Sequence, residues 1–290
     1  MKLSFIIVNY QSREYLEKCV ASVFDCVQNI DFEIIVVNND EFFLDDLYLN
    51  DGFSKNVIFS RLSLTHGSSK KKQFFEKPTN DNIKTNLKII EVNENVGFGR
   101  GCNLGAKEAS GEILCFLNPD TEIISKNISD IIEIFEQKEG VGIVGPKIIK
   151  KSGELQKWTM GRDLTLLRTI KNNLGFIDDK KLWSSNKKQE VDWVTGAVLF
   201  IRKKIFEKID GFDEKFFMYF EDIDLCKRAR LEKYKVMYFP SFIVRHIEGG
   251  SAKNRLEQKK EYYKSQDYYF EKWFSKKTSS LVKFLRKFHF

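Results

Sequence analysis

Four short, strongly apolar segments recur along the first half of the chain, and their spacing limits the possible folds more than any other feature. They are LSFIIV (3–8), FEIIVV (32–37), KIIEV (88–92) and EILCFL (112–117). Each has the length and the β-branched content of a buried strand. Segments with helical spacing, at residues 13–27 and near 102–109, lie between them. Such alternation is typical of a parallel sheet, so the sequence predicts an α/β fold with a mostly parallel central sheet flanked by helices.

Polar residues follow each of these predicted strands. The four sets are Asn9-Tyr10, Asn38-Asn39-Asp40, Asn95 to Gly101 and Asn118-Pro119-Asp120. Ligands of open α/β sheets bind at the carboxyl ends of the strands, so these sets predict a binding site. The carboxylate of Asp120 is a suitable ligand for Mg²⁺ or Mn²⁺, although an Asn-Pro-Asp turn by itself is more typical of ordinary loop structure.

The 290 residues, of which 42% are hydrophobic, can bury one sizeable core. Between about 50 and 86 the sequence becomes polar and contains a lysine run, which we interpret as a surface insertion without chemistry. We therefore predict one folded domain over 1–250, interrupted by this insertion, and a separate tail over 251–290.

Cysteine usage and hydropathy bear on where the chain works. The five cysteines form no CxxC pair and mostly lie in apolar runs, which predicts buried free thiols in a reducing compartment. No run reaches the ~20 apolar residues that cross a bilayer, and the first residues lack the pattern of a signal peptide. We expect a cytoplasmic protein, with contact to the inner face of the membrane left open.

The tail has a distinct composition. Residues 251–290 hold 11 Lys and Arg against 4 Asp and Glu, which accounts for the whole net charge of +7. A nucleic-acid-binding face is usually built into the fold, so no nucleic-acid partner is expected. Aromatic residues at helical spacing over 256–274 predict a helix that packs on the core. Residues 276–290 are expected to contact a membrane. In LVKFLRKFHF (281–290) one face holds the apolar residues Leu281, Phe284, Leu285 and Phe288, while the basic residues Lys283, Arg286 and Lys287 point elsewhere. This pattern is typical of a basic amphipathic helix on an anionic membrane.

The turn NVGFGRGCNLG, which begins at Asn95, allows two interpretations. A strand precedes it, a helix follows, and Asp120 stands where a ribose-binding acid would lie in a dinucleotide-binding unit. The GxGxG spacing and the position after a later strand argue against that interpretation. Glycines that permit a tight turn and close helix packing explain the pattern as well.

The most specific segment is GFDEKFFMYFEDIDLCKR, residues 211–228. A dense aromatic run leads directly into Glu221 and Asp222, and a helix is predicted to follow. Carboxylates in the first turn of a helix are favoured by its dipole. Two acids at the end of an apolar run also border a hydrophobic pocket, which is where a general base is expected.

Taken together, these segments resemble family 2 glycosyltransferases of the GT-A fold, in the rhamnosyltransferase-like branch. The matching pieces, in family order, are FIIVNYQS, FEIIVVNND, NENVGFGRGCNLG, ILCFLNPDTE, GPKI, WVTGAVLFIRK, GFDEKFFMYFEDIDLCKR and RHIEGGS. They cover residues 3–251. The resemblance implies inverting transfer of a sugar from a nucleoside-diphosphate donor.

The resemblance also assigns roles to residues. It implies that Asp222 is the general base, with Glu221 as the second candidate, and that Asp224 orients the helix or the substrate. Asp120 stands at the position of the metal-binding DxD motif, and His246 is implied as a second metal ligand or a diphosphate contact. The implied cofactor is a divalent metal, Mg²⁺ or Mn²⁺.

Donor contacts are expected along the strand ends. The residues are Val8, Asn9, Tyr10, Asn38, Asp40, Asn95, Gly97, Asn103, Asn118 and Trp193. The family usually has an acid where this chain has Asn38. The hydrogen bond to the nucleobase of the donor is therefore expected from Asn38 or from Asp40. Trp193 is expected to line the sugar or acceptor pocket or, alternatively, to belong to the core.

We predict a hexosyltransferase that extends a surface polysaccharide on a lipid-linked acceptor, and rhamnose is the sugar that the resemblance favours. Two alternatives belong to other classes of protein. One is an NAD(P)-dependent oxidoreductase that uses the NVGFGRG turn, and the other is a non-catalytic glycan- or membrane-binding protein with the same fold.

Overall fold

The structure is a computed structural model of the chain and describes residues 1–41, 44, 57–63, 73–75, 85–173, 179–247 and 255–286. The strands are β1 (Leu3–Asn9), β2 (Phe32–Asn38), β3 (Val57–Ser63), β4 (Gln73–Phe75), β5 (Thr85–Glu91), β6 (Ile113–Leu117), β7 (Thr121–Ile123), β8 (Val141–Lys150), β9 (Met160–Gly161), β10 (Gln189–Val191), β11 (Trp193–Val194), β12 (Val198–Arg202) and β13 (Lys235–His246). The helices are α1 (Arg13–Cys26), α2 (Phe98–Glu108), α3 (Ile128–Gln137), α4 (Leu166–Asn173), α5 (Lys180–Trp183), α6 (Lys203–Lys208), α7 (Glu221–Leu231), α8 (Arg255–Trp273) and α9 (Lys276–Arg286).

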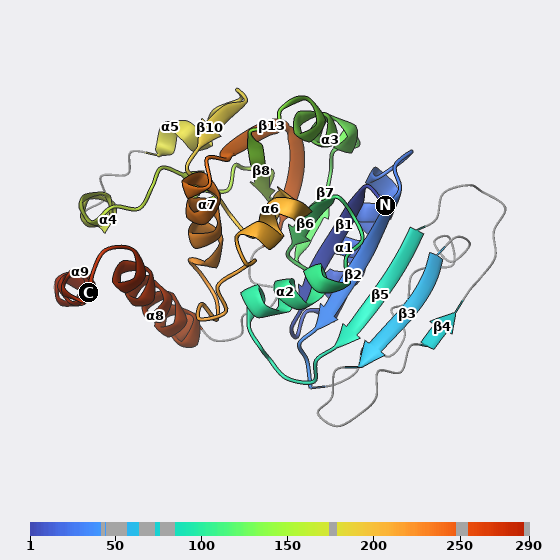
Figure 1. Cartoon of the computed structure of the whole chain (residues 1–290), viewed down its shortest axis with the longest axis horizontal. Helices are drawn as coiled ribbons and strands as arrows, with labels where there is room; N and C mark the ends of the chain where they lie inside the picture. Colours follow the sequence, from blue (N-terminus) through green and yellow to red (C-terminus); the bar gives the residue numbers. More distant parts are fainter. Residues whose placement is uncertain are drawn as a thin grey trace.

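One large sheet runs through the molecule in the order β10-β13-β8-β12-β6-β1-β2-β5-β3-β4 (Figure 1). From β6 to β3 its neighbouring strands are parallel, as the alternation predicts. Strand β12 runs antiparallel between β6 and β8, so the other half is mixed. The register pairs Asn9 with Asn38, which places the polar ends of β1 and β2 side by side.

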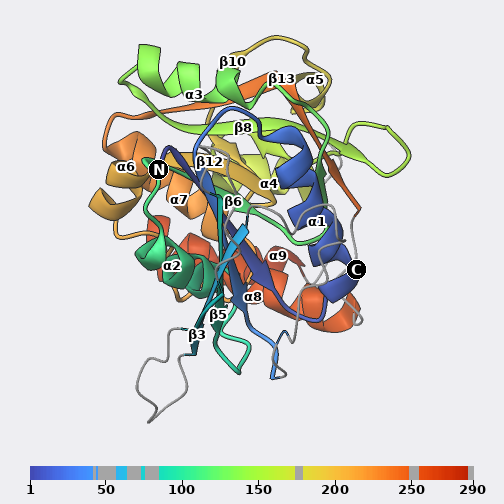
Figure 2. The same ribbon diagram turned by 90° about the vertical axis from the view of Figure 1, so that its right-hand side faces the viewer.

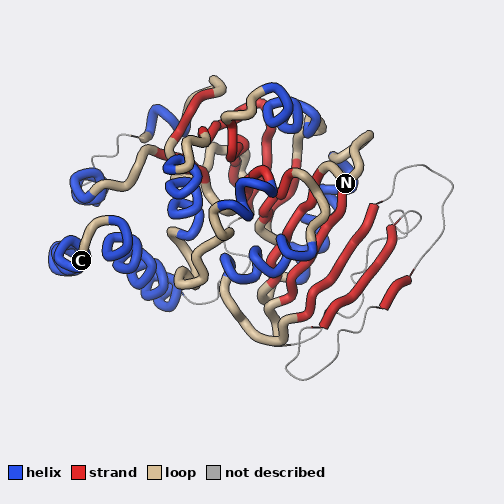
Figure 3. Tube along the Cα trace, viewed as in Figure 1, coloured by secondary structure: helices blue, strands red, loops and turns tan. Residues whose placement is uncertain are grey.

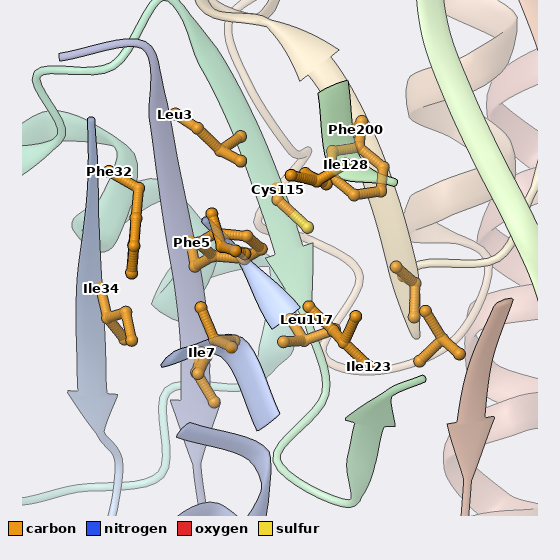
Figure 4. Packing of buried hydrophobic residues seen from close by; sticks show 14 of the residues in the cluster. Leu3, Phe5, Ile7, Phe32, Ile34, Cys115, Leu117, Ile123, Ile128 and Phe200 are labelled. Atoms are coloured by element: carbon orange, nitrogen blue, oxygen red, sulfur yellow. The ribbon is translucent and has the colours of Figure 1, made fainter. Parts of the chain in front are cut away.

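Side chains of the central strands alternate between two cores, one on each face of the sheet. From β1, Leu3, Phe5 and Ile7 enter the core beneath α1 and α3 (Figure 4). Ile6 and Val8 enter the second core, which α2, α6 and α7 cover. Figure 2 shows α1 and α2 on opposite sides of β1. Because both faces are buried, these strands are continuously apolar rather than alternating.

The structure confirms one prediction from the sequence and corrects another. All five cysteines are buried and free, as expected. The segment interpreted as a polar insertion contributes β3 and β4, which extend the sheet beyond β5, so the periodicity missed two strands there. Residues 85 and 86 begin β5, and the other residues of the segment lie outside the described part of the chain. None of the described helices is long and apolar enough to cross a membrane.

The predicted packing of the aromatic tail helix is confirmed. Tyr269 and Phe270 of α8 are fully buried in a third apolar cluster, together with Phe216 and Phe220 from the segment before α7. Val282 of α9 joins the same cluster. The tube view shows α8 and α9 as adjacent helices on the α7 side of the molecule, at the opposite end from β3 and β4 (Figure 3). The helical tail therefore adds to the core.

Candidate active site

The ends of β1 and β2 carry a connected polar network. Asn9 donates from Nδ2 to Asn38 Oδ1 at 2.8 Å and to Asp40 Oδ2 at 2.9 Å. The backbone N–H of Gln11 donates to Asp40 Oδ1 at 2.9 Å. Three of the predicted donor contacts, Asn9, Asn38 and Asp40, thus lie together at the edge where nucleotides bind in such sheets.

Glu91 is a member of this network that sequence reasoning missed. It ends β5, is fully buried and accepts a hydrogen bond from Asn38 Nδ2 at 2.6 Å. An acid at position 38 would place two carboxylates in contact there, which is unfavourable. The amide of Asn38 therefore avoids a pair of carboxylates with Glu91 at this point of the network. The available signal was the one acid inside the apolar segment KIIEV.

The glycine turn brings α2 close to the segment that precedes α7. Gly97 has a φ of 85°, and a Cβ built there would lie 2.5 Å from the carbonyl oxygen of Phe217. That same oxygen accepts the backbone N–H of Phe98 at 3.0 Å, so Phe217 covers the start of α2. Asn95 caps the turn by accepting the Gly97 N–H at 3.1 Å. A dinucleotide would need this helix start for its pyrophosphate, so the arrangement disfavours the oxidoreductase interpretation.

Asn103, on the same helix, forms hydrogen bonds with the segment that precedes the acidic pair. Its Nδ2 donates to the Phe212 carbonyl at 2.9 Å and to Glu214 Oε1 at 3.1 Å, and its Oδ1 accepts the Phe212 N–H at 2.9 Å. The side chain is buried. These hydrogen bonds give Asn103 a structural role, and its contact with the donor stays a prediction.

Glu221 and Asp222 begin α7 in different surroundings. Asp222 is half-buried and accepts the backbone N–H groups of Gly196 and Ile223, each at 2.8 Å. Burial raises the pKa of Asp222 above its usual value, and these hydrogen bonds partly oppose that shift. Glu221 is buried, and its Oε2 has no hydrogen-bond partner among the described residues. Burial and the adjacent Asp222 charge raise the pKa of Glu221 well above its usual value.

Asp120 and His246 also come together. His246 Nε2 lies 3.1 Å from Asp120 Oδ1, and its Nδ1 lies 3.0 Å from Gln156 Oε1. The antiparallel pairing of β7 with β13 creates this contact, because it sets His246 opposite Thr121. Both predicted metal ligands therefore converge, and Asp120 is buried in a turn that the Asn118 carbonyl closes.

The two side chains are chemically suited to a divalent ion. A carboxylate oxygen is a ligand that Mg²⁺ and Mn²⁺ prefer, histidine is a common metal ligand, and Asp120 and His246 lie side by side. No cluster of three or more His, Cys, Asp or Glu side chains suited to a metal exists in the described part of the chain. Asp120 and His246 thus fit a site that the oxygens of a bound diphosphate would complete.

A single segment connects the two halves of the site. Gly196 donates its N–H to Asp222, while the carbonyl of the next residue, Ala197, accepts the N–H of Asn118 at 2.9 Å. A Cβ at Gly196 would lie 3.1 Å from Cε1 of Phe98, so the glycine permits close packing of that ring against the segment. The WVTGA motif therefore joins the acidic pair to the Asn118-Pro119-Asp120 turn.

The other predicted contacts have separate environments. Tyr10 is half-buried beside the network at the end of β1. Val8 packs beneath α2, where a Cβ at Gly101 would lie 2.9 Å from its Cγ1. Trp193 is buried in the core and donates its indole N–H to the Arg162 carbonyl at 3.1 Å, which favours the core alternative for this residue.

The chain belongs to glycosyltransferase-like family 2, whose sequence profile matches residues 2–263. It is 30% identical over 154 residues to the low-salt glycan biosynthesis hexosyltransferase Agl10 of Haloferax volcanii, which covers 52% of the chain and 48% of the relative. It is 25% identical over 188 residues to the N-acetylglucosaminyl-diphospho-decaprenol L-rhamnosyltransferase of Mycobacterium tuberculosis, covering 58% and 61%. The rhamnosyltransferase WbbL of Escherichia coli is 26% identical over 159 residues, covering 52% and 60%. The aligned part therefore spans about half to three-fifths of these relatives.

Solved structures identify the fold as GT-A. Staphylococcus aureus TarS superposes with a TM-score of 0.56 at 16% identity, covering 92% of this chain and 64% of TarS 1–349. Crystal structures of that fragment contain UDP or UDP-GlcNAc. GalNAc-T7, solved with UDP, GalNAc and Mn²⁺, superposes with a TM-score of 0.54 at 14% identity, covering 93% of this chain and 50% of GalNAc-T7.

Proposed function

We propose that this chain is an inverting glycosyltransferase that moves a sugar from a nucleoside-diphosphate donor to a hydroxyl of a glycan acceptor. The observation that carries the proposal is the link through Gly196 and Ala197. It holds a carboxylate base, Asp222, beside the Asn118-Pro119-Asp120 turn, where the diphosphate would bind. A binding module would not need a base at this position, and family membership supports the transferase class.

Asp222 is the better candidate for the base. Asp222 is half-buried and its carboxylate is held by two backbone N–H groups, whereas Glu221 is buried and its Oε2 has no hydrogen-bond partner among the described residues. A base of this kind takes the acceptor proton as the hydroxyl attacks, which accelerates transfer by about 10²–10⁴-fold. Its raised pKa brings its basicity closer to that needed at neutral pH. Attack from the side opposite the leaving diphosphate inverts the anomeric centre.

Asp120 and His246 would hold Mg²⁺ or Mn²⁺ together with the donor diphosphate. The ion supplies charge stabilisation for the leaving group when it is bound. Without it, Nε2 of His246 faces a carboxylate that can only accept, and Nδ1 faces the side-chain amide of Gln156. These two contacts fix the imidazole ring of His246 beside the Asn118-Pro119-Asp120 turn.

The nucleoside would lie across the ends of β1 and β2. Asp40 supplies the negative charge that Asn38 lacks, and it is fixed by Asn9 and by the backbone of Gln11. Two relatives are named rhamnosyltransferases, and one of these names includes a diphospho-decaprenol. We therefore propose rhamnose as the favoured sugar and a lipid-linked surface glycan as the acceptor.

Contact with an anionic membrane would bring the protein to such an acceptor. Leu281 and Phe284 of α9 are exposed, and Lys276, Lys277 and Lys283 on the same helix are exposed as well. Apolar and basic side chains on one surface helix are typical of peripheral membrane binding. Arg286 differs from the prediction, because it turns inward to Asp267 at 2.6 Å. Phe288 lies outside the described residues.

The decisive experiment compares Asp222→Asn with wild type on a panel of UDP and dTDP sugars in the presence of Mn²⁺. We expect transfer to fall by about 10²-fold or more, while the free nucleotide raises the melting temperature of both proteins equally. Asp25→Asn, which changes an exposed acid on α1, is the matched control and should retain activity.

Full activity of Asp222→Asn would reject this residue as the base. A wild-type protein that binds nicotinamide dinucleotides and neither UDP nor dTDP would reject the transferase itself. Binding of a nucleotide sugar without transfer to any acceptor would instead support the non-catalytic glycan-binding alternative.

A further inference from the structure

Helix α8 packs against the segment that carries Glu221 and Asp222 (Figure 1). It contacts residues that come before this acidic pair in the sequence and residues that come after it. The family profile ends at residue 263, inside this helix, which extends to Trp273. Most of the contacts that α8 makes with the site come from residues after that point. They are therefore features of this chain that family membership does not assign.

Before the acidic pair, the backbone adopts a conformation that side chains disfavour. Tyr219 and Phe220 have φ values of 70° and 67°, in the left-handed region. Consecutive non-glycine residues there require support from their surroundings. Ser265 of α8 supplies part of it by donating to the Met218 carbonyl at 2.7 Å. Tyr269 packs its ring 5.6 Å from that of Phe220.

After the acidic pair, α8 holds the buried carboxylate of Asp224. This side chain is fully buried, and Arg228 of its own helix donates to Oδ2 at 2.7 Å. From α8, Trp273 Nε1 donates to Oδ1 at 2.8 Å, and Lys272 Nζ lies 2.7 Å from the same oxygen. Asp224 lies two residues from Asp222 in the first turn of α7, so its position fixes that turn.

Lys272 also contacts Asp213, near the start of the segment 211–228. Its Nζ lies 2.7 Å from Asp213 Oδ2, to which Tyr268 of α8 also donates, at 2.9 Å. Burial opposes the ionised form of Asp213, yet these hydrogen bonds hold its pKa below the usual value. Lys272 thus bridges two acids that lie on either side of Glu221 and Asp222.

We propose that α8 is a positioning element of the active site, which holds Glu221 and Asp222 from both sides through Ser265, Lys272 and Trp273. The proposal rests on the proposed function only for its effect on rate. Without this helix the left-handed turn and the first turn of α7 lose their external support. The base is then displaced from the acceptor, while the nucleotide network at the ends of β1 and β2 is untouched.

Lys272→Met tests the proposal, with Lys260→Met on the exposed side of α8 as the matched control. We expect kcat of Lys272→Met to fall by about 10- to 100-fold, since small displacements of a reacting group have effects of that size. KM for the donor should change less than two-fold. Lys272→Arg should recover most of kcat, and Lys260→Met should match wild type in both constants.

Hydrogen exchange of the backbone amides at 217–226 gives a readout that does not need transferase activity. Exchange should accelerate in Lys272→Met and in Trp273→Phe, and not in Lys260→Met. Unchanged exchange and unchanged kcat in both α8 variants would overturn the proposal. Accelerated exchange in a protein whose wild type transfers no sugar would reject the proposed function and leave the positioning role intact.

Discussion

Glu221 and Asp222 are adjacent in sequence but differ in what surrounds each carboxylate. Asp222 has backbone donors on both oxygens, whereas Glu221 Oε2 has no partner in the described part of the structure. Ionising both acids would place two negative charges side by side in a partly apolar site. The arrangement therefore favours an ionised Asp222 next to a protonated Glu221. The hydrogen-bond partners of each carboxylate thus distinguish the two residues, which the sequence had ranked only by resemblance.

The raised pKa of Glu221 predicts how stability depends on pH. The unfolded state releases this proton near the usual pKa of 4.5, while the folded state keeps it to higher pH. Folding is thus penalised increasingly as the pH rises above 4.5 toward the folded pKa. Glu221→Gln removes the penalty, so the stability of the variant relative to wild type should be greater at pH 8 than at pH 4.

Urea unfolding at pH 4 and pH 8 measures this effect. The difference between the free energies of unfolding of the two proteins should be smallest at pH 4, where Glu221 is largely protonated in both states. Glu154→Gln, a change of an exposed acid, should show no such divergence. A constant difference between Glu221→Gln and wild type at both pH values would contradict the assignment.

At the level of elements, α2 supports the segment that leads to Glu221 and Asp222. Its first turn touches Phe217, its middle packs on β1 through Gly101 and Gly105, and Asn103 bonds to Phe212. The glycines of NVGFGRGCNLG are thus explained by close contact between backbones and strands. Their spacing resembles a dinucleotide-binding turn because both arrangements need helices that approach a sheet closely.

Gly97→Ala tests this interpretation. The residue has φ of 85° and ψ of 170°, a region almost restricted to glycine, and its new Cβ would meet the Phe217 carbonyl at 2.5 Å. We expect a loss of about 1–3 kcal/mol in the free energy of unfolding, together with reduced transfer because Phe217 must move. Thermal unfolding and initial rates measure the two effects.

Gly140→Ala is the matched control, since a Cβ there would have nothing within 4 Å. It should leave stability and transfer close to wild type. Equal behaviour of the two alanine variants would show that the contact between α2 and Phe217 does not constrain the site.

Across the whole molecule, the polar network and the tail lie in different regions. The network lies at the ends of β1 and β2, while α9 lies beyond α8 with Leu281 and Phe284 exposed (Figure 1). The opposite face of α9 is fixed by Val282 in the third cluster and by the hydrogen bond from Ser279 to the Asp267 carbonyl at 2.9 Å. This packing presents the apolar and basic side chains outward.

The double change Leu281→Ser and Phe284→Ser should reduce binding to vesicles that contain phosphatidylglycerol, because it removes the exposed apolar side chains of α9. Each lysine near an anionic surface contributes about 1 kcal/mol, so wild-type binding should also weaken at high salt. Co-sedimentation with these vesicles and with pure phosphatidylcholine measures both effects. Leu167→Ser, at an exposed leucine of α4, is the control. Binding that is unchanged in the double variant would remove the proposed role of α9.

Periodicity and short motifs determined much of this protein in advance. The runs LSFIIV, FEIIVV and EILCFL each form a strand buried on both faces, and the polar residues that follow them meet at one edge. These features depend on local sequence, since a strand that both cores enclose must be apolar at every position. The polar region 50–86 gave no such pattern, and β3 and β4 were missed there.

Only the tertiary structure decided which distant residues meet. Asp120 contacts His246 across 126 positions because β7 pairs with β13, and Asn38 turns to Glu91 because β2 lies beside β5. The contact of α8 with Asp224 depends on how a helix after the sheet folds back, which no local pattern encodes. Sequence specified the chemical groups, whereas strand register and helix docking fixed their partners, because those contacts join segments that are remote along the chain.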